Sequence, residues 1–167
     1  MSLTSDVKIV RYGSPDGHEP LNFGIQASLT VYRGSIAVTA GHGQSHAGYL
    51  HPASTVASTD VCWGLIESAG PGSIDGGPGI AGGSSDGAVT ANVATGTFFL
   101  ASAGSSDQLG VNTLGSTVYV VDEVTVGLTS NSNARPVAGV HVAVDTTGQY
   151  PGGYAIRLGN NQSTGGL

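Results

Sequence analysis

The sequence contains little charge and few aromatic side chains. Of its 167 residues only 10% are charged and 6% are aromatic, and Lys8 is the single lysine. Typical globular domains carry about 25% charged residues. Five cationic side chains are too few to follow a phosphate backbone, so we do not expect nucleic acid as a partner. Coiled coils and long helix bundles need Glu and Lys in bulk, so these classes are excluded as well.

Cysteine and long apolar runs are also scarce. Cys62 is the only cysteine, so no intramolecular disulfide can form, and its apolar surroundings (Val61 to Ile66) predict a buried, inert thiol. The first six residues have neither a basic nor an apolar region, so we expect no signal peptide. No apolar run approaches the roughly 18–20 residues that span a bilayer, so we expect no membrane segment.

The sequence is instead rich in glycine, with 28 residues, and its apolar positions recur with a period of two. This period is typical of β-strands, and no segment shows convincing helical spacing. We therefore predict one all-β domain over residues 1–167, either a small antiparallel β-barrel or a β-sandwich. The expected strands cover residues 7–11, 29–32, 35–39, 61–66, 89–93, 97–100, 117–121, 124–128, 138–145 and 154–158.

Two of these segments allow finer predictions. Asp122 and Glu123 separate two β-branched runs, which predicts a tight hairpin with both carboxylates exposed to solvent. In the strand 138–145, the alternation places His141 and Asp145 on the solvent face.

Three segments are expected to lie outside the regular structure. Residues 1–6 are predicted to form an extended N-terminal arm, residues 70–87 a long glycine-rich loop, and residues 159–167 a flexible C-terminal tail. A long loop in a compact domain is usually functional or disordered, so the loop 70–87 is either an inert excursion or a contact arm.

Three histidines, His42, His46 and His51, fall within ten residues and are the first candidates for chemistry. The first two have the i, i+4 spacing of a helical zinc pair, but the surrounding glycines oppose a helix and no glutamate lies between them. We therefore expect solvated loop histidines and no metal or other cofactor. A metalloprotein that uses these three residues is kept as a minor hypothesis.

Other catalytic constellations have no better support. Distant carboxylate pairs such as Glu67 with Asp145 are conceivable, but no pattern selects them. No serine lies in a Gly-x-Ser-x-Gly elbow, and Lys8 lies outside any glycine loop, so neither a hydrolase nor a phosphate-binding loop is expected. We predict that the protein is not an enzyme. The aromatic residues that could form a sugar-binding platform are Trp63, Tyr49, Tyr150 and Tyr154, although Trp63 is expected in the core.

A resemblance to a known family emerges between about Gly96 and Asp145. The segment contains a Gly-x-Phe strand (Gly96 to Leu100), the hairpin GSTVYVVDEVTV, and the strand RPVAGVHVAVD that begins at Arg135. In this order and spacing the three pieces resemble the head-decoration proteins of tailed phages, also called capsid cement proteins. Upstream, Arg33 to Val38 and Gly48 to Ala53 resemble the usual opening strands of that family.

The resemblance implies a non-enzymatic virion protein that binds the outside of the expanded head and ties capsomers together. Its partners would be the major capsid protein and further copies of itself, with a homotrimer favoured and a homodimer possible. The expected contact residues are Ser2, Leu3, Thr4 and Ser5 in the arm, Ile74 and Ile80 in the glycine-rich loop, and Arg135 and Pro136. The alternative function is a carbohydrate- or receptor-binding β module of a phage tail fibre or adhesin.

Overall fold

The structure is a computed structural model that describes residues 3–6, 20–70, 78–150 and 153–159. Within these ranges the chain forms strands and short 3-10 helices, and it contains no α-helix. The predicted all-β class is therefore confirmed. The predicted strand over residues 7–11 lies outside the described residues.

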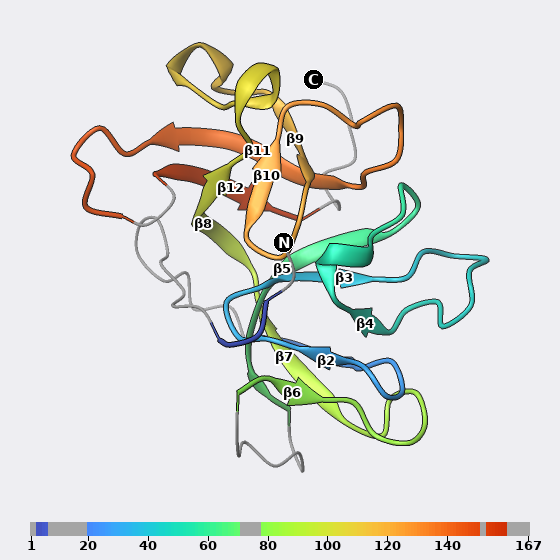
Figure 1. The fold of residues 1–167 in the computed structure, drawn as a ribbon. Helices are drawn as coiled ribbons and strands as arrows, with labels where there is room; N and C mark the ends of the chain where they lie inside the picture. Colours follow the sequence, from blue (N-terminus) through green and yellow to red (C-terminus); the bar gives the residue numbers. More distant parts are fainter. Residues whose placement is uncertain (1–2, 7–19, 71–77, 151–152, 160–167) are drawn as a thin grey trace.

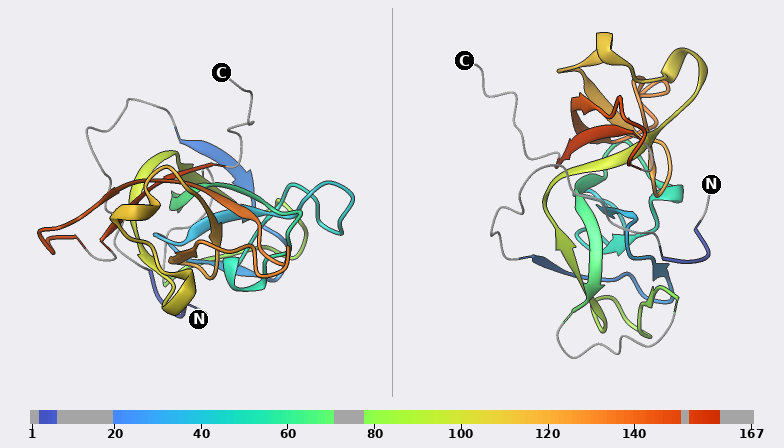
Figure 2. Two further views of the ribbon diagram at one scale, coloured as in Figure 1. Left: turned by 90° about the horizontal axis from the view of Figure 1, so that it is seen from above. Right: turned by 90° about the vertical axis from the view of Figure 1, so that its left-hand side faces the viewer.

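Two lobes follow one another along the chain and stack end to end (Figures 1 and 2). We call the described part of residues 20–94 the sheet lobe and the described part of residues 96–159 the barrel lobe. Thr95 alone separates the last strand of the first lobe from the first strand of the second. The two lobes are therefore joined by an almost continuous strand.

The sheet lobe contains a curled five-stranded sheet with the order β1-β7-β5-β3-β4 and a small pair, β2-β6. A parallel bridge between Ile25, just after β1, and Leu50 in β4 brings the two edges of the curled sheet together. The elements are β1 (Leu21–Gly24), β2 (Thr30–Val31), β3 (Ile36–Thr39), β4 (Leu50–His51), η1 (Ala53–Thr55), β5 (Val61–Ala69), β6 (Ile80–Ala81) and β7 (Thr90–Ala94).

The barrel lobe is a closed five-stranded barrel with the order β10-β8-β12-β11-β9. Its pairs are antiparallel except for a two-residue parallel pairing of β10 with β8. The elements are β8 (Gly96–Ser102), η2 (Ser105–Asp107), η3 (Val111–Thr113), β9 (Thr117–Val120), β10 (Thr125–Gly127), β11 (Val137–Val144) and β12 (Tyr154–Leu158).

The larger core cluster crosses the boundary between the lobes. Cys62 and Leu65 of β5 pack there with Phe98, Val118 and Ile156 of the barrel lobe. A second, smaller cluster lies wholly in the sheet lobe around Ile25, Ile66 and Val93. Because one apolar cluster is shared, burial of its surface couples the two lobes energetically.

The glycine-rich segment 70–87 is partly built into the fold, which corrects the prediction of a loop without elements. Ile80 is 2% exposed and lies in β6, which pairs with β2. Gly82, Gly83 and Gly87 continue the attachment through backbone hydrogen bonds to the segment 25–29. Ile74 and its neighbours, residues 71–77, lie outside the described residues, as do residues 160–167 of the predicted tail.

The strand predicted at 138–145 exists as β11, but its faces differ from the prediction. His141, expected on the solvent face, is fully buried. The pairing of β11 shifts register between Val137 and Gly139 and again between His141 and Ala143, and each shift changes which side chains point inward. The backbone is also crowded at Gly139, where a Cβ atom would overlap the carbonyl group of Arg157.

Candidate functional site

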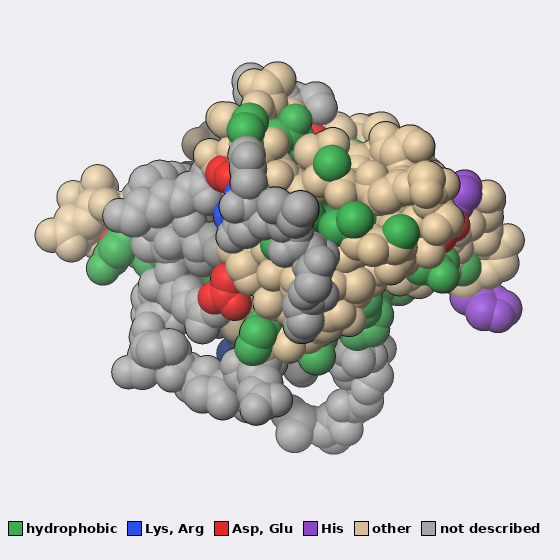
Figure 3. All heavy atoms as spheres, turned by 90° about the horizontal axis from the view of Figure 1, so that it is seen from below, with side chains coloured by type: hydrophobic (Ala, Val, Ile, Leu, Met, Phe, Trp, Pro, Cys, Tyr) green, Lys and Arg blue, Asp and Glu red, His purple; other side chains and the backbone are tan. Residues whose placement is uncertain are grey.

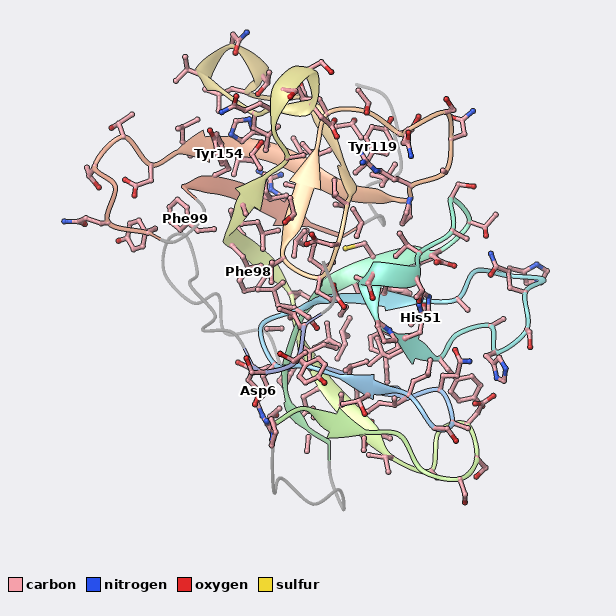
Figure 4. All side chains as sticks on the ribbon, in the orientation of Figure 1. Asp6, His51, Phe98, Phe99, Tyr119 and Tyr154 are labelled. Atoms are coloured by element: carbon pink, nitrogen blue, oxygen red, sulfur yellow. The ribbon has the colours of Figure 1, made fainter. Side chains whose placement is uncertain are left out.

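The first described residues, Leu3 to Asp6, lie against both lobes instead of extending away from them. The backbone N–H of Leu3 donates to Glu123 Oε1 in the barrel lobe at 3.3 Å. At the other end of this short segment, Asp6 contacts the sheet lobe near β6 (Figure 4). Leu3 is half-buried, whereas Thr4 and Ser5 are exposed, and Ser2 lies outside the described residues. We call Leu3 to Asp6 the arm.

The carboxylate of Asp6 occupies a small site that we call the Arg33–Gly79 notch. Asp6 Oδ1 accepts hydrogen bonds from the backbone N–H groups of Arg33 at 2.9 Å and Gly79 at 3.1 Å, and Oδ2 pairs with the Arg33 guanidinium at 2.6 Å. Burial alone would raise the pKa of Asp6, but the hydrogen bonds and positive charge of Arg33, with a smaller effect of Gly79, lower it. The notch is therefore a carboxylate-binding site, and the arm fills it.

The acidic hairpin tip between β9 and β10 is confirmed as a hairpin, but the prediction that its carboxylates are solvated is wrong. Asp122 is 8% exposed and Glu123 is 2% exposed. Asp122 Oδ1 accepts the N–H of Val124 at 3.0 Å. Burial by itself raises the pKa of Asp122, and hydrogen bonds from Val124 and the Thr125 hydroxyl outweigh it and lower the pKa. The tip is buried because it packs where the two lobes meet.

Glu123 is the residue that joins three parts of the molecule. Its carbonyl oxygen accepts the N–H of Ile36 at the start of β3 at 2.7 Å, and its Oε1 accepts the arm through Leu3. Its Oε2 is buried and has no hydrogen-bond partner among the described residues. Barrel lobe, sheet lobe and arm thus converge on one residue, the sheet lobe on its backbone carbonyl and the arm on its side chain.

The other carboxylate pair considered from the sequence is Glu67 with Asp145. These two residues lie in different lobes, with Glu67 in β5 of the sheet lobe and Asp145 in the turn after β11 of the barrel lobe.

The three histidines do not converge on a metal site. His42 is exposed, and His46 pairs through Nδ1 with Asp86 Oδ2 at 2.6 Å. His51 is buried against Asp60, whose carboxylate lies 3.3 Å from its Nε2, so the prediction of a solvated loop histidine is wrong for His51 (Figure 4). Across the described ranges, no group of three or more His, Cys, Asp or Glu side chains could hold a metal ion.

The other predicted contact residues serve the fold. The Arg135 guanidinium donates to Asp107 Oδ2 at 2.6 Å and to the carbonyl of Thr129 at 3.2 Å. Burial favours a raised pKa for Asp107, but the bonds from Arg135 and Thr129 lower it. Pro136 is buried, and Ile80 is a core residue. Arg135, Pro136 and Ile80 are thus engaged within the chain itself.

The candidate aromatic residues do not form one platform. Trp63 packs at 5.0 Å on the ring of Phe23, and Tyr154 packs edge-on at 5.8 Å against His141. Tyr49 is also half-buried. Of the four, Tyr150 is the well-exposed one, at 41%, and its ring stacks on Phe99 at 4.4 Å with an interplanar angle of 7°. Tyr150 is thus the one residue of the four predicted aromatic residues whose ring is well exposed.

Sequence reasoning missed an exposed apolar pair at one end of the barrel lobe. Val111 in η3 is 68% exposed and Leu114, just after it, is 49% exposed. The signal was available, because two large aliphatic residues interrupt the polar segment from Gly110 to Gly115. By contrast, the surface of the sheet lobe seen from below shows mainly polar side chains and backbone, with hydrophobic side chains scattered singly (Figure 3). The pair is a candidate contact surface.

Comparison with protein-family models, with curated proteins and with solved structures finds no match for this chain. A search of the described part of the chain for membrane-spanning helices also finds no candidate.

Proposed function

We propose that the protein is a structural component of a tailed-phage virion that binds the outer surface of the expanded head and cements neighbouring capsomers. The observation that carries the proposal is the placement of the resembling segments. The Gly-x-Phe segment is β8, the acidic hairpin is β9 with β10, and the segment that begins at Arg135 leads into β11. All three belong to one closed barrel, and the two upstream segments that share the resemblance contribute to β3 and β4 of the sheet lobe.

The proposed partners are the major capsid protein and other copies of this chain, as a trimer or as a dimer. The exposed pair Val111 and Leu114 is the surface that we propose for the capsid contact. Burial of two such side chains stabilises an interface by roughly 1.5–3 kcal/mol each when it is complete. Val111 and Leu114 are 68% and 49% exposed, so burial of these exposed portions accounts for about a tenfold gain in affinity, which corresponds to about 1.4 kcal/mol.

Co-sedimentation with expanded, undecorated heads tests this function. We expect saturable binding at a fixed ratio of copies to capsid subunits, and this ratio indicates the oligomer and the symmetry axis. A double variant, Val111→Ser with Leu114→Ser, should bind about tenfold more weakly. The matched control is Leu21→Ser, which removes an exposed apolar side chain from the other lobe and should bind within about twofold of wild type. Absence of wild-type binding, with the β-sheet circular dichroism intact, would exclude the cement role.

The exposed Tyr150 ring supports a second candidate, a carbohydrate-binding module. Tyr150 lies in the turn after β11, which begins at Asp145. Both carboxylate oxygens of Asp145 stabilise this turn, because they accept the N–H groups of Thr147 and Tyr150 at 2.8 Å each. The ring is therefore presented in a fixed orientation, which lowers the entropic cost of stacking a sugar on it. A glycan-array signal that disappears with Tyr150→Ala would favour this function over the cement role.

A further inference from the structure

The Arg33–Gly79 notch is formed by the body of the sheet lobe, whereas its occupant comes from a separate part of the chain. Gly34 and Gly79, with φ of 79° and 80°, shape the two turns that present the N–H groups of Arg33 and Gly79. Gly34 also donates to the carbonyl of Ile66 at 2.8 Å, so the first turn is fixed without the arm. The notch is therefore a preformed carboxylate site.

The arm itself adds little to the core. Thr4 and Ser5 are exposed, and the ion pair at the notch leaves Arg33 and Asp6 side chains 20% and 30% exposed. Exposed ion pairs of this kind contribute only about 0.2–1 kcal/mol. None of the four described arm residues has a fully buried side chain, so hydrogen bonds and one ion pair hold the docked arm, and core packing does not.

A second copy of the chain offers the same arm with the same chemistry. Residues 7–19 separate the arm from Pro20 and the start of β1. A segment of that length reaches at most about 45 Å, whereas a globular chain of this size is about 40 Å across. The arm of one molecule can therefore reach the notch of a molecule beside it.

We propose that the Arg33–Gly79 notch is an interaction site for Asp6 of a neighbouring copy, so that copies crowded on a surface exchange arms. The hydrogen bonds are the same within one chain and between chains. The balance between an arm in its own notch and an arm in a neighbour's notch therefore depends on the local concentration of notches. Short tethers give effective concentrations in the millimolar range, and a dense array of copies reaches a similar value. In dilute solution each arm occupies its own notch, and in an array the exchanged arms link the copies.

Paired variants separate exchange from docking within one chain. Asp6→Ala keeps the notch and removes the acid of the arm, whereas Arg33→Asp keeps the acid and repels it from its own notch. In neither variant does the chain's own notch hold the carboxylate of its own residue 6. In a mixture, the arm of the Arg33→Asp protein can dock only on the notch of the Asp6→Ala protein.

The readout is the backbone amide signal of Gly79 in ¹⁵N-labelled Asp6→Ala protein, because this N–H donates to the Asp6 carboxylate in the wild type. On addition of unlabelled Arg33→Asp protein to about 1 mM, the signal should move at least halfway to its wild-type position. The control titrant is the unlabelled double variant, Asp6→Ala with Arg33→Asp, and it should leave the signal unchanged.

No movement of the Gly79 signal at that concentration would overturn the proposal, and so would equal movement with the control titrant. Circular dichroism of each variant at the wild-type value ensures that the result reports docking and not unfolding. The crowding of copies rests on the proposed function, but the titration contains no heads. A failure of arm exchange is thus distinguishable from a failure of head binding.

Discussion

Replacement of Asp6 by asparagine should measure how firmly the arm is docked. The substitution removes the charge of the carboxylate and keeps the size of the side chain. In the wild type this carboxylate accepts two backbone N–H groups and the Arg33 guanidinium. Because residue 6 lies outside both core clusters, Asp6→Asn should change the docking of the arm and leave the packing of the two lobes intact.

The expected loss of stability is about 1 kcal/mol at pH 7, because the ion pair is partly exposed and screened by solvent. For a domain of this size, such a loss lowers Tm by roughly 2–4 °C. Docking that contributes RT ln(1 + K) of about 1 kcal/mol corresponds to a docking constant K of about 5. The arm would then be undocked roughly one-sixth of the time, which is the reversibility that arm exchange requires.

The pH dependence has a definite sign. The pKa of Asp6 is lower in the folded protein than in the unfolded chain. Its contribution is therefore fully present above the unfolded pKa of about 3.9 and is lost as the pH falls through the folded pKa. The difference in stability between wild type and Asp6→Asn should be constant from about pH 7 to about pH 5 and should shrink below about pH 4.

Urea unfolding followed by circular dichroism at several pH values is the appropriate assay. Thr4→Ala is the matched control, because Thr4 is exposed on the same arm, and it should change stability by less than about 0.5 kcal/mol. Equal urea midpoints for wild type and Asp6→Asn at pH 7 would refute the docking energy that we assign to the notch.

Three further predictions concern the body of the fold. Asp60→Ala should cost about 3 kcal/mol in urea unfolding, because the buried carboxylate accepts two backbone N–H groups and faces an imidazole, and a loss below about 1 kcal/mol would contradict this role. Gly139→Ala should destabilise by about 3 kcal/mol, because its Cβ would overlap a carbonyl group of β12, and an unchanged Tm would show that the strands can separate. Burial raises the pKa of Cys62 to about 12, so a thiol reagent at pH 8 should react with one equivalent only after denaturation, and rapid reaction of the native protein would contradict the burial.

The strands were the most predictable part of the structure. Alternation of apolar and polar residues located β7 and β12, and runs of β-branched and aromatic residues located β3, β8 and β9, each to within a few residues, because both signals are local properties of the sequence. The hairpin at Asp122 was predictable for the same reason, since the bond from Val124 N–H to the Asp122 carboxylate forms within the turn.

Burial of polar residues was not predictable, because it depends on where distant segments meet. Glu123 is buried where β3 and the arm meet the hairpin tip, and both of these segments lie far from it in the sequence. His141 is buried because two register shifts in β11 rotate it inward, and its Nε2 then lies 3.0 Å from the carbonyl of Ala143. No composition or spacing rule marks a β-bulge whose cause lies in the partner strand.

The position of Glu123 links the arm to the contact between the lobes. The same residue fixes β3 through its carbonyl oxygen and holds Leu3 through Oε1, while Oε2 is buried without a partner in the described part of the chain. A buried carboxylate oxygen without a hydrogen bond is costly, so the bond from Leu3 to Oε1 offsets part of that cost when the arm docks. The bond to Oε1 needs only the backbone N–H of the arm, so a neighbouring arm that restores the same bond is equivalent to the original one.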